Sequence, residues 1–190
     1  MNSIEYEVLA KDVEDIANGF ANCCKKGCAF CCYQMIEVYD FEKESIIMGL
    51  RKLSKEIRDE IRVNLDKWFD FFNANTPENK ILDEHDTIQN FINISLTKKE
   101  KCPLLINNQC SIYANRPLTC RIHSVESSPG KCEADPYRQS SPKSNNLRSH
   151  MIQYIIELNL NKSELLFLPF LIAEEIKTNK KIKPLKKLYI

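Results

Sequence analysis

Apolar side chains recur at helical spacing along much of the chain, most regularly in the segment that follows Ser54. Successive apolar positions there are four, four, three and four residues apart: Ile57, Ile61, Leu65, Trp68 and Phe72. This spacing places them on one face of an α-helix, and a serine just before the first turn is a favourable N-cap. The pattern therefore predicts a long amphipathic helix that begins after Ser54 and is broken at Pro77.

Weaker patterns predict shorter helices elsewhere in the chain. They fall on residues 4–18, 81–93, 147–159 and 163–177. A further helix is expected after Asp40, which is a candidate N-cap. The stripe expected to be buried in the first of these consists of Ile4, Val8, Val13 and Ile16. Its end is expected at Asn18-Gly19, because a glycine after the last turn favours termination.

Three segments lack helical spacing and predict extended or irregular structure. Residues 34–39 are expected to be extended, and residues 102–113 predict a hairpin around the Asn107-Asn108 turn. Residues 133–146 are polar and rich in serine and proline, which predicts a surface loop. The expected fold class is mainly α: a helical domain with a short hairpin and an irregular knot rich in cysteine.

The composition narrows the classes of protein to which the chain could belong. It has 190 residues and only four glycines, with no GxGxxG or GxxxxGK[ST] motif, so a glycine-rich phosphate-binding loop is nearly excluded. The formal net charge of +1 gives no overall field that would favour nucleic acid or an anionic membrane. The longest apolar stretch, residues 165–173, contains Pro169 and is too short to span a bilayer.

The N-terminal sequence has no basic start followed by an apolar run, so it lacks the pattern of a secretory signal. We therefore expect a cytoplasmic protein, in a reducing compartment where free thiols and metal thiolates outweigh disulfides. The alternative is a secreted domain held by disulfides with one odd cysteine, although such domains are usually shorter and richer in glycine. The basic tail, residues 178–190, is expected to be a solvated terminus, with contact to nucleic acid or an acidic partner as the alternative.

Cysteine is the residue type whose number most exceeds what packing requires. Five cysteines fall within residues 23–32 and four follow, nine in all: Cys23, Cys24, Cys28, Cys31, Cys32, Cys102, Cys110, Cys120 and Cys132. Isolated cysteines often serve as small core residues, which would account for one or two of these but not for nine. A thiolate-bound metal is therefore the leading explanation, with Cys23 as the candidate spare because Cys24 fits the spacing better.

The spacing C-x3-C-x2-C-C suits metal binding. Cys24 and Cys28 lie one helical turn apart, and the two residues between Cys28 and Cys31 allow both thiolates to hold one centre. The side chains of the neighbours Cys31 and Cys32 diverge, so they could serve one centre with strain or face two centres. The expected metal ligands are Cys24, Cys28, Cys31, Cys32, Cys102, Cys110, Cys120 and Cys132.

Ligation by sulfur alone selects zinc or an iron–sulfur cluster over hard cations such as magnesium. The thiols could form two four-cysteine zinc sites, which would be structural, or one cluster with spare thiols. The Cys102-Pro103 pair is similar to the Cys-Pro ending of ferredoxin loops and favours iron–sulfur slightly. Arg116 and Arg121 are candidates to offset the negative charge of such a centre or to hold carbonyls of its loop.

The three histidines offer weaker candidates. His123 lies three residues after Cys120 and could be a metal ligand or a donor to one, although a partly buried polar contact is the expected role. His85 falls on an apolar helix face, and His150, near a helix start, is expected to be exposed. No HExxH motif and no serine–histidine–aspartate arrangement is visible, so we predict no catalytic residue.

The same residues carry a family resemblance. The motifs are C-x3-C-x2-C-C from Cys24, CP at Cys102, CSIYxxRPxxCR from Cys110, and the trailing Cys132. In these motifs the chain resembles the YkgJ-type cysteine-cluster family, whose members are described as zinc- or iron-chelating proteins. The resemblance covers residues 24–132 and implies a metal-chelating domain. His123 departs from it, since members often carry an aromatic residue nearby. Some relatives are flagellin lysine N-methylases, which implies a cluster and a methyl donor in those longer enzymes.

We expect one domain over residues 1–190, in which a cysteine-rich metal-binding knot joins residues 23–32 to residues 102–132 between flanking helices. Metal bonds would offset the entropy cost of closing that loop. The expected function is metal binding through a cysteine-thiolate centre, iron–sulfur or zinc, in a structural, redox or sensory role. The alternatives are a methyltransferase-like enzyme that uses the cluster, and a protein that stores or delivers zinc or iron. Nothing in the sequence identifies a substrate.

Overall fold

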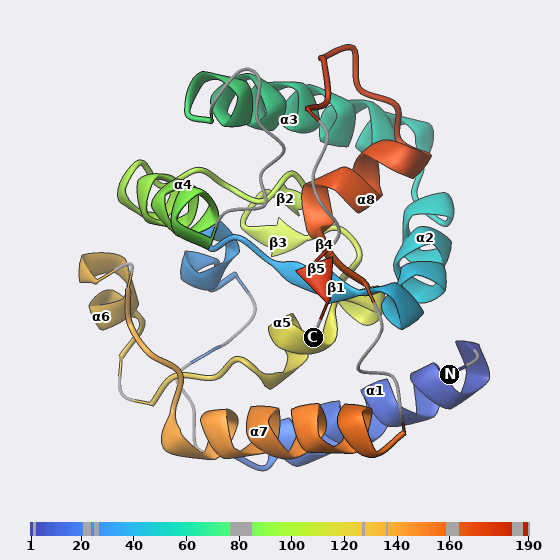
Figure 1. Ribbon diagram of the computed structural model, residues 1–190, viewed down its shortest axis with the longest axis vertical. Helices are drawn as coiled ribbons and strands as arrows, with labels where there is room; N and C mark the ends of the chain where they lie inside the picture. The colour runs from blue at the N-terminus through green and yellow to red at the C-terminus, as the bar shows by residue number, and fades with distance from the viewer. Residues whose placement is uncertain are drawn as a thin grey trace.

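The structure is mainly α-helical, as the sequence predicts (Figure 1). The computed structural model describes residues 1, 3–20, 24, 27–76, 85–126, 128–135, 137–158, 164–183 and 188–189. Its α-helices are α1 (Ser3–Asn18), α2 (Lys43–Arg51), α3 (Lys55–Ala74), α4 (His85–Thr97), α5 (Leu118–Ile122), α6 (Pro129–Ala134), α7 (Pro142–Glu157) and α8 (Leu168–Glu175). Short 3-10 helices lie among them: η1 (Phe30–Tyr33), η2 (Asp40–Glu42) and η3 (Tyr113–Asn115).

The described residues form two small antiparallel sheets. The first has the strand order β1-β4-β5, from β1 (Glu37–Tyr39), β4 (Glu164–Phe167) and β5 (Leu188–Tyr189). Within it Val38 pairs with Leu166, so a strand near the start of the chain is joined to one near its end. Figure 1 shows this sheet in the middle of the molecule, with α3 and α8 on one side and α1 and α7 on the other.

The second sheet is the predicted hairpin, which is confirmed. Its strands are β2 (Leu105–Ile106) and β3 (Gln109–Cys110), with Ile106 opposite Gln109. The turn residues Asn107 and Asn108 have φ of 49° and 58°, in the left-handed region that a two-residue hairpin turn of this kind requires. Asparagine tolerates that region better than most residues, so the local sequence decides the turn.

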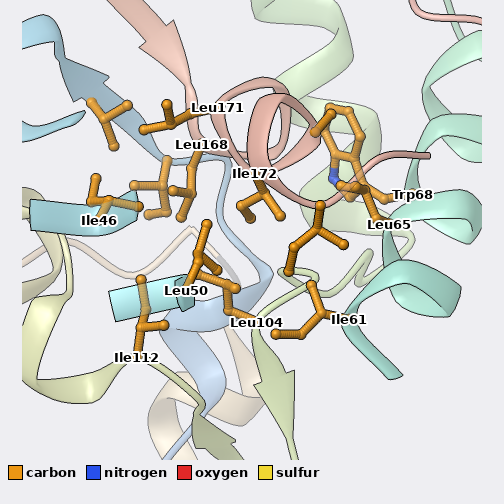
Figure 2. Packing of buried hydrophobic residues seen from close by; sticks show 14 of the residues in the cluster. Ile46, Leu50, Ile61, Leu65, Trp68, Leu104, Ile112, Leu168, Leu171 and Ile172 are labelled. Atoms are coloured by element: carbon orange, nitrogen blue, oxygen red, sulfur yellow. The ribbon is translucent and has the colours of Figure 1, made fainter. Parts of the chain in front are cut away.

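The main hydrophobic core lies around α3 and α8. Ser54 caps α3 as predicted, because its Oγ accepts a hydrogen bond from the backbone N–H of Ile57 at 3.4 Å. The apolar face of the helix is buried, with Trp68 stacked on Phe72 at a centroid distance of 5.2 Å. Around this face lie Ile46, Leu50, Leu104, Ile112, Leu168, Leu171 and Ile172 (Figure 2).

The predicted helix at the start of the chain is observed as α1, but the predicted buried face is wrong. Ile4, Val8 and Ile16 are exposed, and of the predicted stripe only Val13 is buried. The buried face consists of Tyr6, Ala10, Val13 and Ala17. Their spacing of four, three and four residues fits one face of a helix better than the spacing of the larger side chains in the predicted stripe. Two alanines on this face let α1 approach α5 and α7 closely.

Two element starts differ from the prediction near the middle of the chain. Asp40 is not the N-cap of α2: it opens the 3-10 helix η2, and Tyr39 occupies the N-cap position of that turn. The helix expected over 81–93 is observed as α4 from His85, while residues 81–84 and the side chain of His85 lie outside the described residues.

Two further boundaries differ in the last third of the chain. The loop expected over 133–146 contains the start of α7, because Ser141 Oγ accepts a hydrogen bond from Ser144 N–H at 3.2 Å and caps that helix. The helix expected over 163–177 begins only at Leu168, since Glu164–Phe167 form β4. Pairing with β1 decides this segment, whose apolar run fits a strand as well as a helix.

The basic tail is not the solvated terminus that the sequence predicts. Residues 178–183 lie along α3, where Thr178 donates a hydrogen bond to Asp66 and Lys180 forms an ion pair with Asp70 at 2.8 Å, and residues 188–189 form β5 of the first sheet. The ammonium of Lys183 is buried and donates to the carbonyls of Asn73 and Thr76 at 2.9 and 2.8 Å. These carbonyls lie at the C-terminal end of α3, where cations are favoured.

None of the helices in the described part of the chain combines the length and the apolar character needed to cross a bilayer.

Candidate metal centre

The described cysteines come from the segment around η1, the hairpin and the residues before it, α5 and α6, and none of the eight is in a disulfide. Cys24 and Cys28 precede η1, which itself carries Cys31 and Cys32. The others lie before the hairpin, in β3, in α5 and in α6: Cys102, Cys110, Cys120 and Cys132. Cys23, the expected spare, lies outside the described residues.

Backbone hydrogen bonds bring the two distant halves of the cysteine pattern together. The N–H of Cys102 donates to the carbonyl of Cys32 at 2.7 Å, across seventy residues of sequence. The hairpin then returns the chain so that Cys110 lies opposite Leu105. Before Cys28, Gly27 has a φ of 88°, which favours glycine and turns the chain toward η1.

Six of the cysteines line one cavity of about 520 Å³: Cys28, Cys31, Cys32, Cys102, Cys110 and Cys120. Its remaining wall is partly apolar, from Ile36, Leu104 and Leu168, and partly polar, from Arg116 and His123. We call it the larger cavity. The structure therefore gathers thiols from both halves of the predicted knot around one space.

A smaller cavity of about 20 Å³ lies beside α6, and we call it the smaller cavity. Four cysteines line it: Cys24, Cys28, Cys31 and Cys132. His123 and Asp135 also line it. Each of the eight described cysteines thus lines at least one of the two cavities, and Cys28, Cys31 and His123 line both.

Shared cavities do not amount to a finished coordination site. In the part of the chain that the structure describes, no three cysteine, histidine, aspartate or glutamate side chains converge closely enough to hold a metal ion as they lie. Side-chain rotations would be needed to bring the sulfur atoms to about 2.3 Å from a zinc ion.

Burial and crowding decide the protonation of the thiols around the larger cavity. Burial and the neighbouring Cys110 raise the pKa of Cys102 to about 12. Burial and the charge of Cys31 raise the pKa of Cys120 well above its ordinary value. The Cys32 thiol donates a hydrogen bond to the Cys31 sulfur, which lowers the pKa of Cys31 to about 7 and raises that of Cys32. Most of these thiols therefore stay protonated until a cation compensates their charge.

Two arginines beside Cys120 are anchored by one carboxylate of α1. Glu14 forms ion pairs with Arg116 at 3.0 Å and with Arg121. The guanidinium of Arg121 also donates to the carbonyls of Arg116, at 3.0 Å, and Ala114, so it holds the loop as the sequence analysis suggested. Arg116 lies over the ring of Tyr113 at 3.9 Å, and its charge lowers the pKa of nearby thiols.

His123 makes the partly buried polar contact that was expected. Its Nδ1 lies 2.9 Å from Ser140 Oγ. Burial, with a smaller effect of Arg148, lowers the pKa of His123, so the ring is neutral near pH 7. His150 is exposed, also as expected.

Two acidic residues near the site were not predicted from the sequence: the partly buried Glu14 and the buried Glu42. Glu42 is fully buried and accepts a hydrogen bond from the N–H of Leu118 at 2.7 Å, at the start of the helix that carries Cys120. Both acids share a helical face with buried neighbours: Glu14 lies four residues after Ala10 and three before Ala17, and Glu42 lies three and four residues before Ser45 and Ile46. An acidic residue on a buried face was the signal that could have found them.

This arrangement defines a helical protein with a thiol cluster at the junction of its N-terminal and central segments. A family model named CxxCxxCC and described as "Putative zinc- or iron-chelating domain" matches residues 22–145, so the chain belongs to this family. The family resemblance seen in the sequence is thereby confirmed, together with zinc or iron as the metal its thiols are described to chelate. No curated protein and no solved structure matched the chain.

Proposed function

We propose that this protein binds its metal in the larger cavity, through a centre ligated by cysteine thiolates. The observation that carries the proposal is the convergence of six cysteines from three segments on one space. Packing alone does not require so many thiols in one place, whereas soft metals select sulfur ligands. Arg116 lines the cavity and would offset part of the negative charge that four thiolates would leave, while Arg121 lies next to Cys120 in α5 and pairs with Glu14.

An iron–sulfur cluster fits this cavity better than a single zinc ion. A zinc ion needs four ligands and a space little larger than one atom, but the cavity has six thiols and a volume of about 520 Å³. A cluster of several atoms uses both features. In the cytoplasm, where thiols stay reduced, such a centre would serve a structural, redox or sensory role.

The apolar wall favours a second candidate function, an enzyme that binds a small molecule beside the centre. The volume of the larger cavity lies within the range of small-molecule sites, which combine apolar walls with few polar groups. Ile36, Leu104 and Leu168 supply the apolar part, and Arg116 supplies a cation. Methyl transfer, by analogy with the N-methylases of the family, is one such activity.

The test is the metal content of protein purified without oxygen. Iron together with acid-labile sulfide and visible absorbance is expected. Stoichiometric zinc with neither sulfide nor absorbance would contradict the cluster and leave a thiolate zinc site, and metal-free protein would contradict both. Binding that is labile and variable in stoichiometry would instead favour storage or delivery.

A pair of variants tests whether the larger cavity holds the metal. We expect Cys120→Ser to lose the centre, because it removes one of the convergent thiols. Thr119→Ser changes the neighbouring residue on the same cavity wall and should keep the metal content of the wild type. Equal metal content in both variants would show that the cavity is not the site.

A further inference from the structure

The smaller cavity differs from the larger one in its size and in its ligand types. Its volume of about 20 Å³ leaves room for one atom, not for a cluster. It is formed where α6 packs against η1, which brings Cys132 to the cysteines of the N-terminal segment. Any metal held there would be a single ion.

The cysteines divide unequally between the two cavities. Cys32, Cys102, Cys110 and Cys120 line the larger cavity and not the smaller one, while Cys24 and Cys132 line the smaller cavity and not the larger one.

Cys31 and Cys28 line both cavities. Cys31 accepts a hydrogen bond from Cys32 and interacts electrostatically with Cys102, Cys110 and Cys120, which assigns it to the larger cavity. Cys28 precedes η1 in the same segment as Cys24 and supplies a third thiol to the smaller cavity. Three thiols fall one ligand short of the tetrahedral set that zinc prefers.

His123 is the candidate for the fourth ligand. It lines the smaller cavity, and its Nδ1 is occupied by the hydrogen bond with Ser140 at 2.9 Å, so Nε2 is the nitrogen that can bind a metal. A histidine that ligates a metal almost always bonds an oxygen through its other nitrogen, which fixes the ring.

Ser140 is itself held in place by the start of α7. The N–H of the next residue, Ser141, donates to the carbonyl of Ser124 at 2.8 Å, and the hydroxyls of these two serines lie 3.2 Å apart. This contact ties residues 140–141 to residues 123–124. These contacts hold the imidazole in one orientation, whereas the thiols of the smaller cavity must rotate to reach a metal ion, since no three such side chains in the described residues converge as they lie.

We propose that Cys24, Cys28, Cys132 and His123 form a second site, separate from the centre in the larger cavity, for a single zinc ion. Four ligands leave no open position, so this zinc is structural. It fastens α6 and the end of α5 to the N-terminal cysteine segment. The inference rests on the proposed function only in that both assign metal to the thiol cluster, and the two can fail separately.

The test compares zinc per chain, and the metal of the larger cavity, in the full-length protein and its variants. His123→Ala and Cys132→Ser should each hold one zinc per chain less than the wild type while retaining the centre of the larger cavity. Cys120→Ser should do the reverse. His150→Ala removes an exposed histidine and should change neither metal.

Two further variants keep the test decisive if a ligand substitution disturbs folding. His123→Cys supplies a fourth thiol, so it should retain the ion and strengthen the thiolate absorption when cobalt replaces zinc. Ser140→Ala leaves every ligand in place and should lower zinc affinity about 10–100-fold by freeing the ring.

Two results would overturn the second site. One is a His123→Ala protein with the zinc content and cobalt spectrum of the wild type. The other is parallel loss of all metal in Cys132→Ser and Cys120→Ser, which would indicate one shared centre. Wild-type protein without any metal would overturn the proposed function as well.

Discussion

The carboxyl group of Glu42 joins three elements at one buried point. It accepts hydrogen bonds from the N–H of Tyr39 at 2.9 Å, the N–H of Leu118 at 2.7 Å and the hydroxyl of Tyr6 at 3.3 Å. These donors lie in β1, α5 and α1. Burial raises the pKa of Glu42 to about 7, although the three hydrogen bonds each lower it. The group is therefore protonated in the folded protein at pH values where the unfolded chain has already released its proton.

This shift predicts that the free energy of unfolding falls as pH rises from about 4.5 to about 7. In that window only the unfolded state loses the Glu42 proton. The free energy of unfolding is therefore up to about 3 kcal/mol lower at pH 7 than below pH 4.5. Glu42→Gln stays neutral and should show a flatter profile in urea unfolding at pH 5 and pH 7. Glu44→Gln, an exposed change on α2, should follow the wild type. Equal slopes in all three proteins would contradict the assignment.

The buried thiols predict that metal affinity increases with pH. Because the pKa values of Cys102 and Cys120 are raised, these groups are protonated at pH 7, and a metal must displace their protons. Affinity should rise about tenfold per pH unit for each proton released between pH 6.5 and 8. Competition with a chelator of known pH dependence measures this, and an affinity independent of pH would contradict it.

Close approach of α2 and η3 sets the position of the segment that leads to Arg116 and Cys120. A Cβ atom on Gly49 would lie 2.7 Å from Cβ of Asn115, whose amide donates to Ser45 Oγ at 3.1 Å. Alanine normally stabilises a helix relative to glycine, but here it would overlap a neighbour.

We therefore expect Gly49→Ala to lower the free energy of unfolding by about 1–3 kcal/mol. Gly130→Ala is the matched control on α6, where the nearest atom to the new Cβ is 4.0 Å away, and it should be neutral or stabilising. Denaturant titration of both proteins measures the difference. A stabilised Gly49→Ala protein would mean that η3 gives way to the methyl group.

The tail that lies along α3 makes a further prediction. Lys183→Met leaves the carbonyls of Asn73 and Thr76 without their buried donor and should destabilise the protein by about 1–3 kcal/mol. Lys181→Met removes the same charge from an exposed position and should change stability by less than about 0.5 kcal/mol. Thermal unfolding of the pair tests this, and equal effects would indicate that only the net charge matters.

The elements that the sequence predicted well are those whose pattern has one interpretation. The large apolar residues of α3 recur at helical spacing, and Asn107-Asn108 suit a two-residue hairpin turn, so each pattern predicts one structure. The predicted buried face of α1 was wrong because Ala10 and Ala17 are small and only weakly hydrophobic, although they allow close packing. The segment before Leu168 is apolar without a period, so only its partner β1, far away in sequence, determines that it is a strand.

The candidate site was predictable in its residue types and not in its grouping. Spacing identified the cysteines, because neighbouring thiols in a chain are a local property. Their division between two cavities depends on how η1, the hairpin and α6 meet, which is a tertiary property. The roles of Glu14 and Ser140 depend on contacts over more than ten residues and left no trace in the spacing.

On the scale of the whole molecule, the cysteine segments and the α3–α8 core should respond differently to loss of metal. The core around Trp68 and Leu171 is built from apolar contacts, whereas the segments around Cys32 and Cys102 carry the thiols. Chelation should lower the free energy of unfolding and increase amide exchange in residues 102–123 while α3 stays protected. Hydrogen exchange with and without chelator measures this, and uniform loss of protection would show that the two parts unfold together.

The pairing of β1 with β4 has a practical consequence for anyone who studies this family. The matched region, residues 22–145, contains β1 but neither β4 nor α8, and it stops shortly after α7 begins. A fragment cut at those limits would leave Val38 without its strand partner and uncover the side of α5 that α1 shields. Such a fragment should aggregate, and its metal content would describe damaged protein, so spectroscopy belongs on the 190-residue chain.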